Sequence, residues 1–227
     1  MPIYQLPREH QFPHPSQAEK EGILAVGGDL SPQRLLIAYS QGIFPWYSKG
    51  EPILWWSPDP RFVLDPKALH VPRSLQKTLR RGTYVTTFDC AFAMVIRGCA
   101  QVRQETGTWI TLEMERAFIR LHRLGLAHSV ETWILEEEFP MLVGGVYGLN
   151  LGGIFFGESM FSLRPDASKV AFVTLVNRLV AMDCQLVDCQ VASDHLSRFG
   201  ARDIPREEFL SRLQTALLAP MQIGSWR

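Results

Sequence analysis

Residues 141–169 read MLVGGVYGLNLGGIFFGESMFSLRPDASK, and the expected fold is built around them. Apolar runs here are bounded by the glycine pairs Gly144-Gly145 and Gly152-Gly153, a pattern typical of two strands joined by a tight turn. The second strand is apolar or aromatic at almost every position, which predicts that both of its faces are covered. Its middle nevertheless carries Glu158, and a buried carboxylate is unfavourable without a partner.

A second apolar run, QLVDCQV at residues 185–191, places Asp188 and Gln190 in similar surroundings. Carboxylates with perturbed pKa values concentrate at working sites, so we expect Glu158, Asp188 and Gln190 to form the polar centre of an otherwise apolar sheet. The alternative is that backbone amides or an arginine pair with the two carboxylates, which then only stabilise the fold.

The composition is that of an ordinary globular protein. The chain has 227 residues, 46% of them hydrophobic, and a formal net charge of zero. A neutral total argues against a protein that coats nucleic acid, but leaves room for a local basic patch. No signal or membrane-spanning segment is recognisable, and the four cysteines lack metal-ligand spacing. We expect a soluble cytoplasmic protein, monomeric, without metal.

The first part of the chain predicts one helix. Residues 1–20 hold four prolines and should wrap the surface without forming an element. Residues 22–29, GILAVGGD, lack the GxxxxGK[ST] pattern of a phosphate loop and are interpreted as a turn leading to a helix. Ser31 is the expected N-cap with Pro32 at the first helical position, and Gly42 the expected end.

Residues 43–61, IFPWYSKGEPILWWSPDPR, combine three tryptophans with four prolines. The prolines predict a rigid loop with a short strand over residues 53–56. Trp46 follows Phe-Pro in a glycine-flanked turn and is a candidate platform on which a base or an aromatic side chain stacks. Trp55 and Trp56 could equally be lids on a core.

Residues 72–81, PRSLQKTLRR, predict a short basic amphipathic helix. Leu75 and Leu79 share one face, and the remaining surface carries cations that suit phosphate contacts, namely Arg73, Lys77, Arg80 and Arg81. The alternative is a solvated charged face.

The remaining patterns complete an α+β domain with a mixed sheet. Strands are expected over residues 84–88 and 128–134, the latter leading through 136–139 into the hairpin. Asp89 is the expected N-cap of a helix ending at Cys99, and further helices are expected over 111–124, 168–182 and 207–218. His122 is interpreted as a structural histidine. We place a small α+β unit at residues 1–61 and the main domain at 62–227.

The motifs resemble one family, the leucyl/phenylalanyl-tRNA–protein transferases. The matching strings cover most of residues 20–206 in the family's order: GGDLSPQRLL, AYSQGIFPWY, PILWWSPDPR, GCA followed by GTWI, LHRLGLAHSVE, LVGGVYG, GESMFS, ASK and DCQ. The resemblance implies a cytoplasmic bacterial enzyme whose larger domain is GNAT-like (acyl-CoA N-acyltransferase-like). It moves leucine or phenylalanine, and also methionine, from aminoacyl-tRNA to the N-terminal arginine or lysine of a protein, which marks that protein for degradation.

The resemblance also assigns roles to residues. Trp46 and Trp109 line the site of the terminal adenosine, and the basic helix meets tRNA phosphates. Glu158, Asp188 and Gln190 form the reacting centre. The pocket for the transferred side chain draws on apolar residues of the sheet and the neighbouring helix: Met160, Val146, Phe172, Leu175 and Val187.

The chemistry implied by the family needs no cofactor, because the donor is an ester and the nucleophile an amine. We expect Asp188 to orient Gln190 and to accept or relay a proton, Gln190 to hold the amine or the oxyanion, and Glu158 to balance a positive charge. Two other functions compete: an N-acyltransferase of the same fold that uses acyl-CoA or builds peptidoglycan bridges, and a non-catalytic RNA-binding adaptor. The chain has no glycine pattern suited to CoA, and the adaptor would not need buried carboxylates.

Overall fold

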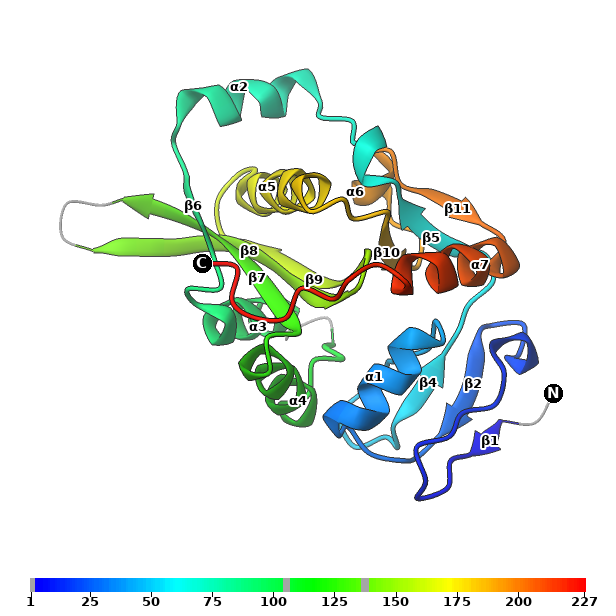
Figure 1. Ribbon diagram of the computed structural model, residues 1–227. Coiled ribbons are helices and arrows are strands. Elements are labelled where there is room, and N and C mark those ends of the chain that lie inside the picture. Colours follow the sequence, from blue (N-terminus) through cyan, green and yellow to red (C-terminus); the bar gives the residue numbers. More distant parts are fainter. Residues whose placement is uncertain (1–2, 104–106, 136–138) are drawn as a thin grey trace.

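The computed structural model describes residues 3–103, 107–135 and 139–227. It contains a four-stranded sheet, a seven-stranded sheet and helices packed on both (Figure 1). The α+β class and the mixed sheet expected from the sequence are confirmed. Within the described residues, no helix combines the length and apolar character needed to cross a bilayer. The predicted connection at 136–139 falls mostly outside the described residues.

The small sheet has the strand order β1-β2-β4-β3. Its strands are β1 (Tyr4–Gln5), β2 (Ile23–Val26), β3 (Phe44–Pro45) and β4 (Leu54–Trp56). Two expectations are wrong here: β1 lies within the segment expected to lack elements, and β2 lies within the segment interpreted as a turn. The reason is pairing with distant strands, since β2 lies between β1 and β4. The strand predicted at 53–56 is confirmed.

Helix α1 (Pro32–Ser40) packs beside this sheet and has the predicted ends. The Ser31 hydroxyl accepts a hydrogen bond from the backbone N–H of Arg34 at 3.4 Å. Gly42, two residues beyond the last residue of the helix, has a φ of +74°. Trp55 is fully buried, and its indole N–H donates to the Gly27 carbonyl at 2.8 Å. The core interpretation is therefore correct for Trp55.

The large sheet has the order β11-β5-β10-β9-β8-β7-β6, in which β10 runs parallel to β9 and the other neighbours are antiparallel. Its strands are β5 (Arg61–Leu64), β6 (Val85–Phe88), β7 (Ala127–Leu135), β8 (Pro140–Leu151), β9 (Ile154–Ser162), β10 (Leu186–Gln190) and β11 (Arg202–Ile204). The remaining α-helices are α2 (Arg73–Arg81), α3 (Phe92–Gln101), α4 (Leu112–Arg123), α5 (Ala167–Ala181), α6 (Asp194–Ser197) and α7 (Arg206–Leu217). Short 3-10 helices lie at Pro15–Gln17 (η1) and Pro66–Ala68 (η2).

The predicted hairpin consists of β8 and β9, joined at Gly152-Gly153. Gly144 and Gly145 lie within β8 instead of bounding it. A Cβ on Gly144 would lie 2.7 Å from the Cβ of Ala167 in α5, and one on Gly145 would lie 3.0 Å from Val95 in α3. These glycines therefore let helices approach the two faces of the sheet closely.

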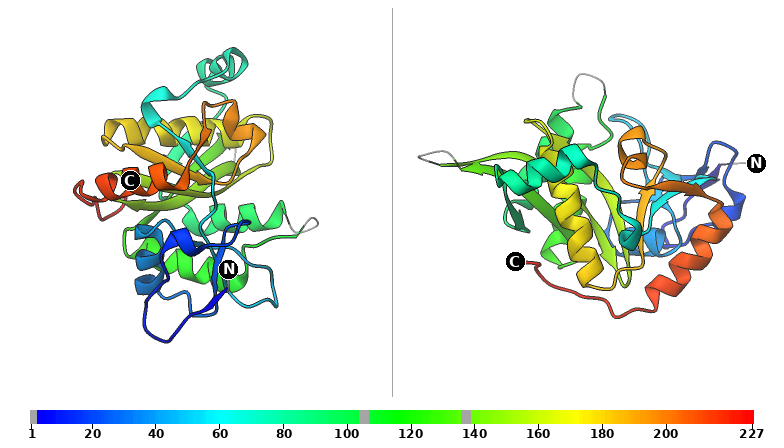
Figure 2. Two further views of the ribbon diagram at one scale, coloured as in Figure 1. Left: turned by 90° about the vertical axis from the view of Figure 1, so that its right-hand side faces the viewer. Right: turned by 90° about the horizontal axis from the view of Figure 1, so that it is seen from above.

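Helices cover both faces of the large sheet. Helix α5, with α2 beyond it, covers one face, while α3 and α4 cover the other, on the side of the small sheet (Figures 1 and 2). One apolar cluster joins α1 and the small sheet to α3, α4 and α7, and a second lies between α5 and the large sheet. The division at residue 61/62 stays a prediction; the last strand of the small sheet ends at Trp56 and the first of the large sheet begins at Arg61.

Asp89 is not the N-cap of α3, which begins at Phe92. The backbone of Asp89 has a φ of +57°. Its carboxylate is buried and accepts hydrogen bonds from the backbone N–H groups of Ser129 and Trp226. The Nδ1 of His128 lies 2.9 Å from the same carboxylate. These partners are far away in the sequence, so the local capping pattern could not reveal them.

His122 is structural, as expected. Its ring stacks on Phe92 at a centroid distance of 4.3 Å, and its Nδ1 lies 2.8 Å from the Ala127 carbonyl oxygen.

Candidate active site

Strands β9 and β10 pair over only three residues each, Ile154–Phe156 with Leu186–Asp188. Beyond that point, residues of both strands line a cavity of about 470 Å³. The cavity also borders β3, α5 and the residues Val102, Arg103 and Trp109. Its size is typical of small-molecule sites, which makes the end of the β9–β10 pairing the candidate active site.

Irregularities in β9 and β10 place Glu158 and Gln190 at this cavity. Glu158 is the extra residue of a bulge in β9, because Gly157 pairs with Gly148 and Ser159 with Tyr147. A second bulge in β10 precedes Gln190, whose φ is +64°. A bulge redirects side chains relative to a regular strand, and a positive φ is uncommon for glutamine. Both residues therefore depart from regular strand geometry where the cavity begins.

Glu158 is bound by two donors at one oxygen. Its Oε1 accepts a hydrogen bond from the Tyr39 hydroxyl at 2.7 Å and another from the Gln190 amide at 3.0 Å. Burial raises the pKa of Glu158 to about 8; these hydrogen bonds oppose the rise, whereas the nearby Asp188 adds to it. The carboxyl is therefore mostly protonated at neutral pH.

Asp188 is fully buried and paired with an arginine. Arg61 donates from Nε to Oδ1 at 2.8 Å and from Nη2 to Oδ2 at 2.7 Å, and neither side chain is exposed. Oδ1 also accepts the backbone N–H of Gln190 at 2.9 Å. An arginine and a backbone amide are the partners named by the structural alternative. Through that amide, however, Asp188 also holds the backbone of the active-site glutamine.

Arg61 is itself held in place on several sides. Its guanidinium lies 4.8 Å from the ring centre of Phe44 and 4.5 Å from that of Phe209, and its Nη1 donates to the Gly42 carbonyl at 3.1 Å. Arg61 and Tyr39 were not predicted as the partners of Asp188 and Glu158. A buried carboxylate calls for a cation, but no signal distinguishes Arg61 among the 23 lysines and arginines.

The residues expected to bind substrate lie around the same cavity. Apolar side chains between α5 and the sheet form its inner wall: Val146, Met160, Phe172, Leu175 and Val187. Trp46 and Trp109 also line it, and Trp46 remains 40% exposed. The structure thus brings together every expected cavity residue except Asp188, which lies behind Gln190. The four cations of α2 are exposed and lie outside the cavity.

The cavity also contains His195, to which the sequence analysis gave no role. Its Nε2 is buried and has no hydrogen-bond partner within the described residues. Burial lowers the pKa of His195, as do the charges of Lys169 and Arg198, so the imidazole is neutral at physiological pH. In the same described part of the chain, no group of three His, Cys, Asp or Glu side chains could hold a metal ion.

Comparison with known proteins identifies the family. Residues 63–214 match the family model described as leucyl/phenylalanyl-tRNA protein transferase, and residues 28–59 match that of its N-terminal domain. The chain belongs to this family. The leucyl/phenylalanyl-tRNA protein transferase motifs recognised in the sequence are thereby confirmed as marks of membership.

Curated members of the transferase family align over the whole chain. The leucyl/phenylalanyl-tRNA–protein transferase of Anaeromyxobacter dehalogenans (strain 2CP-C) is 60% identical, over 100% of this chain and 97% of its own length. That of Myxococcus xanthus (strain DK1622) is 57% identical with the same coverage. Among solved structures, L-PGS from Bacillus licheniformis is similar with a TM-score of 0.43 and 10% identity, over 90% of this chain and 65% of that one.

Proposed function

We propose that this protein transfers leucine, phenylalanine or methionine from aminoacyl-tRNA to the N-terminal arginine or lysine of acceptor proteins, forming a peptide bond. The observation that carries the proposal is an apolar cavity that ends at the hydrogen-bonded pair Glu158–Gln190. Such a cavity suits a leucyl or phenylalanyl side chain, and its polar end suits the reacting ester and amine. A charged-tRNA donor would place the enzyme in the cytoplasm.

The donor would enter past the two tryptophans. Trp46 and Trp109 would hold the terminal adenosine by stacking, because every base presents an aromatic face. The aminoacyl side chain would then occupy the cavity and pack against Val146, Leu175 and Val187. The exposed cations of α2 would meet the tRNA backbone.

The acceptor's α-amino nitrogen attacks the ester carbonyl and forms a bond to its carbon, and the bond from that carbon to the ribose oxygen breaks. The leaving ribose oxygen takes up a proton and becomes a hydroxyl, while the amine nitrogen loses one and becomes the amide nitrogen. The amine needs no strong base, since the pKa of an α-amino group is about 7.7–8.0. Gln190 would hold the amine or the developing oxyanion with its amide. Holding the ester and the amine next to each other would lower the activation barrier by several kcal/mol, on the order of that seen for well-oriented intramolecular reactions.

Asp188 and Glu158 would have different roles. The contacts of Asp188 with Arg61 and with the backbone of Gln190 favour a positioning role over the proton relay expected from the sequence. Glu158 would ionise when the basic acceptor arrives, since an opposite charge nearby favours the charged form of a carboxyl.

The test is transfer of radiolabelled leucine from leucyl-tRNA to a model protein beginning with arginine or lysine, beside the same protein beginning with alanine. We expect label on the first two and none on the third. Label on none of them while the tRNA still binds would refute the proposed reaction and favour an RNA-binding adaptor.

A further inference from the structure

Phe155 connects the cavity wall to a part of the molecule that the proposed reaction does not use. It lies on β9, is fully buried and lines the cavity beside Val187. Its ring lies against the backbone of Gly148 on β8: a Cβ there would be 2.5 Å and 2.6 Å from two ring carbons. The ring is therefore blocked on that side.

Trp226 is a second neighbour of this ring. It belongs to segment 219–227, which follows α7 and runs along the large sheet (Figure 1, red). Its indole is 5% exposed, and its ring centre lies 6.0 Å from that of Phe155, at an interplanar angle of 37°. Trp226 thus belongs to the same buried cluster as Phe155 and the apolar cavity wall, without lining the cavity itself.

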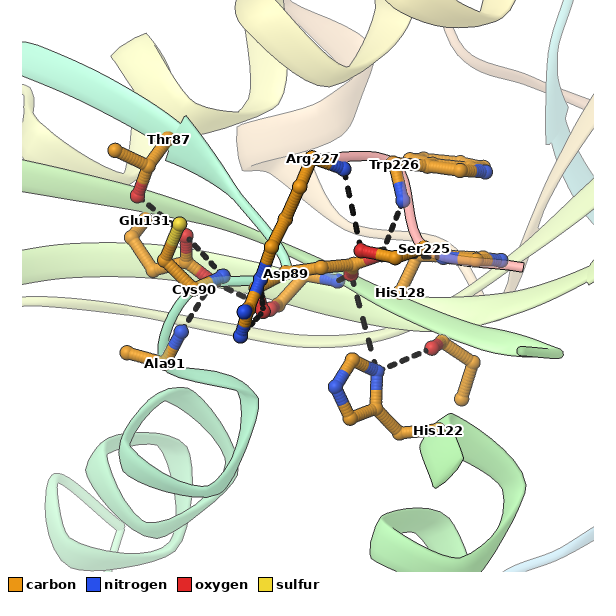
Figure 3. Close-up of polar contacts among 12 residues, drawn as sticks. Thr87, Asp89, Cys90, Ala91, His122, His128, Glu131, Ser225, Trp226 and Arg227 are labelled. Atoms are coloured by element: carbon orange, nitrogen blue, oxygen red, sulfur yellow. Dashed lines mark hydrogen bonds and ion pairs between the residues drawn. The ribbon is translucent and has the colours of Figure 1, made fainter. Parts of the chain in front are cut away.

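Ring stacking and hydrogen bonds fix the position of Trp226 (Figure 3). Its indole stacks on His128 at a centroid distance of 4.0 Å and an angle of 3°, and its backbone N–H donates to the Asp89 carboxylate at 2.8 Å. Arg227 donates from Nε and Nη2 to the Asp89 carbonyl at 3.0 and 2.9 Å. Gly224 donates to the Gly125 carbonyl at 3.2 Å. With these contacts, segment 219–227 gives Trp226 a defined position behind Phe155.

We propose that Trp226 is a specificity-determining residue, which limits the size of the transferred side chain by holding Phe155 against the cavity. This inference rests on the proposed transfer of leucine and phenylalanine. Dense packing transmits a change of volume to neighbouring residues. If the indole is removed, the Phe155 ring can move into its space and the cavity deepens, which favours the larger phenylalanyl group.

The test compares kcat/KM for phenylalanyl-tRNA with kcat/KM for leucyl-tRNA, using one acceptor that begins with arginine. For Trp226→Ala we expect the Phe/Leu ratio to rise by about 10-fold, at the lower end of the roughly 10- to 200-fold discrimination per methylene of apolar pockets. Trp226→Phe should raise it less. Met221→Ala is the control, because Met221 lies in the same segment, is 46% exposed and takes no part in the contacts that position the indole, so its ratio should equal that of the wild type.

A merely structural role predicts a different result: the activities for both donors fall together and the ratio stays constant, which would overturn the inference. If Trp226→Ala does not fold, Trp226→Phe and Phe155→Leu decide, since each creates space along the same line of contacts and should shift the ratio in the same direction. A wild-type protein that transfers neither amino acid would refute the proposed function itself, whereas an active wild type with an unchanged variant ratio would refute only the role of Trp226.

Discussion

Glu158 retains its proton near neutral pH, because burial raises its pKa from 4.5 to about 8. In the unfolded chain the same carboxyl ionises above about pH 4.5, so between these values the native state binds more protons than the unfolded state. The contribution of Glu158 to the free energy of unfolding therefore falls as pH rises through this window, by up to about 1.4 kcal/mol per pH unit.

The substitution Glu158→Gln removes this titration and keeps an oxygen that can accept hydrogen bonds from Tyr39 and Gln190. We expect the wild type to lose stability relative to Glu158→Gln between about pH 5 and pH 8. Urea unfolding at several pH values measures the difference. Parallel stability curves for the two proteins would show that the carboxyl is not perturbed.

Arg61 and Asp188 form a buried ion pair, and loss of one partner leaves an uncompensated charge. Arg61→Leu should lower the free energy of unfolding by about 3–5 kcal/mol, and adding Asp188→Leu should restore much of that loss. The matched control is Arg97→Ala, which breaks an ion pair with Glu115 whose arginine is 64% exposed. We expect less than about 1 kcal/mol there. Equal losses in chemical denaturation would contradict this account.

At this scale the sequence could predict which polar residues lie together in the sheet, but not the contacts that hold them. Glu158 and Gln190 stand out because polar residues interrupt apolar strands, and the two prove to be hydrogen-bonded to each other. Tyr39, which donates to Glu158, and Arg61, which pairs with Asp188, each lie more than a hundred positions away in the sequence from the carboxylate they contact. No local pattern could therefore predict these contacts. Asp89 shows the same limit, since its true partners replaced the helix cap that local sequence favours.

Helix α2 is predicted to contact the phosphates of the tRNA, and Arg73, Arg80 and Arg81 are exposed on it. Replacing all three with glutamine should weaken tRNA binding and flatten its salt dependence, by about 0.7–0.9 in the log–log slope per lost phosphate contact. Affinities measured over a range of salt concentrations give the slope. The control replaces three exposed arginines of α4 in the same way, Arg116, Arg120 and Arg123.

If the α2 and α4 variants lose affinity and slope equally, net charge alone attracts the tRNA and α2 has no specific role. An unchanged slope in the α2 variant would contradict the prediction outright.

Elements with strong periodicity could be predicted from the sequence, whereas several of the short strands could not. Helix α4 and the β8–β9 hairpin follow from apolar spacing and glycine signals. Strands β1, β2 and β11 have two to four residues, and their existence depends on a neighbouring strand supplied by the fold. The bulges that present Glu158 and Gln190 likewise become visible only in the strand register.

The small sheet and the large sheet share one apolar cluster, in which Tyr39 and Trp55 join residues such as Phe118 and Phe156. We therefore expect a single unfolding transition, because opening either part would expose the same buried surface. Tryptophan fluorescence and far-UV circular dichroism should give coincident urea curves. Two separated transitions would show that the predicted units 1–61 and 62–227 unfold independently.

The whole account depends on Gln190, which connects the ion pair behind the cavity to Glu158 within it. The most direct test is the single-turnover rate of transfer from pre-bound leucyl-tRNA to an acceptor that begins with arginine, for wild type, Gln190→Ala and the control Gln185→Ala. We predict that Gln190→Ala is slower by about 100- to 1,000-fold, as for the loss of an oxyanion donor. Its affinity for leucyl-tRNA should be unchanged, and Gln185→Ala, exposed just before β10, should match the wild type. A Gln190→Ala rate within a few-fold of the wild type would contradict the proposed reacting centre.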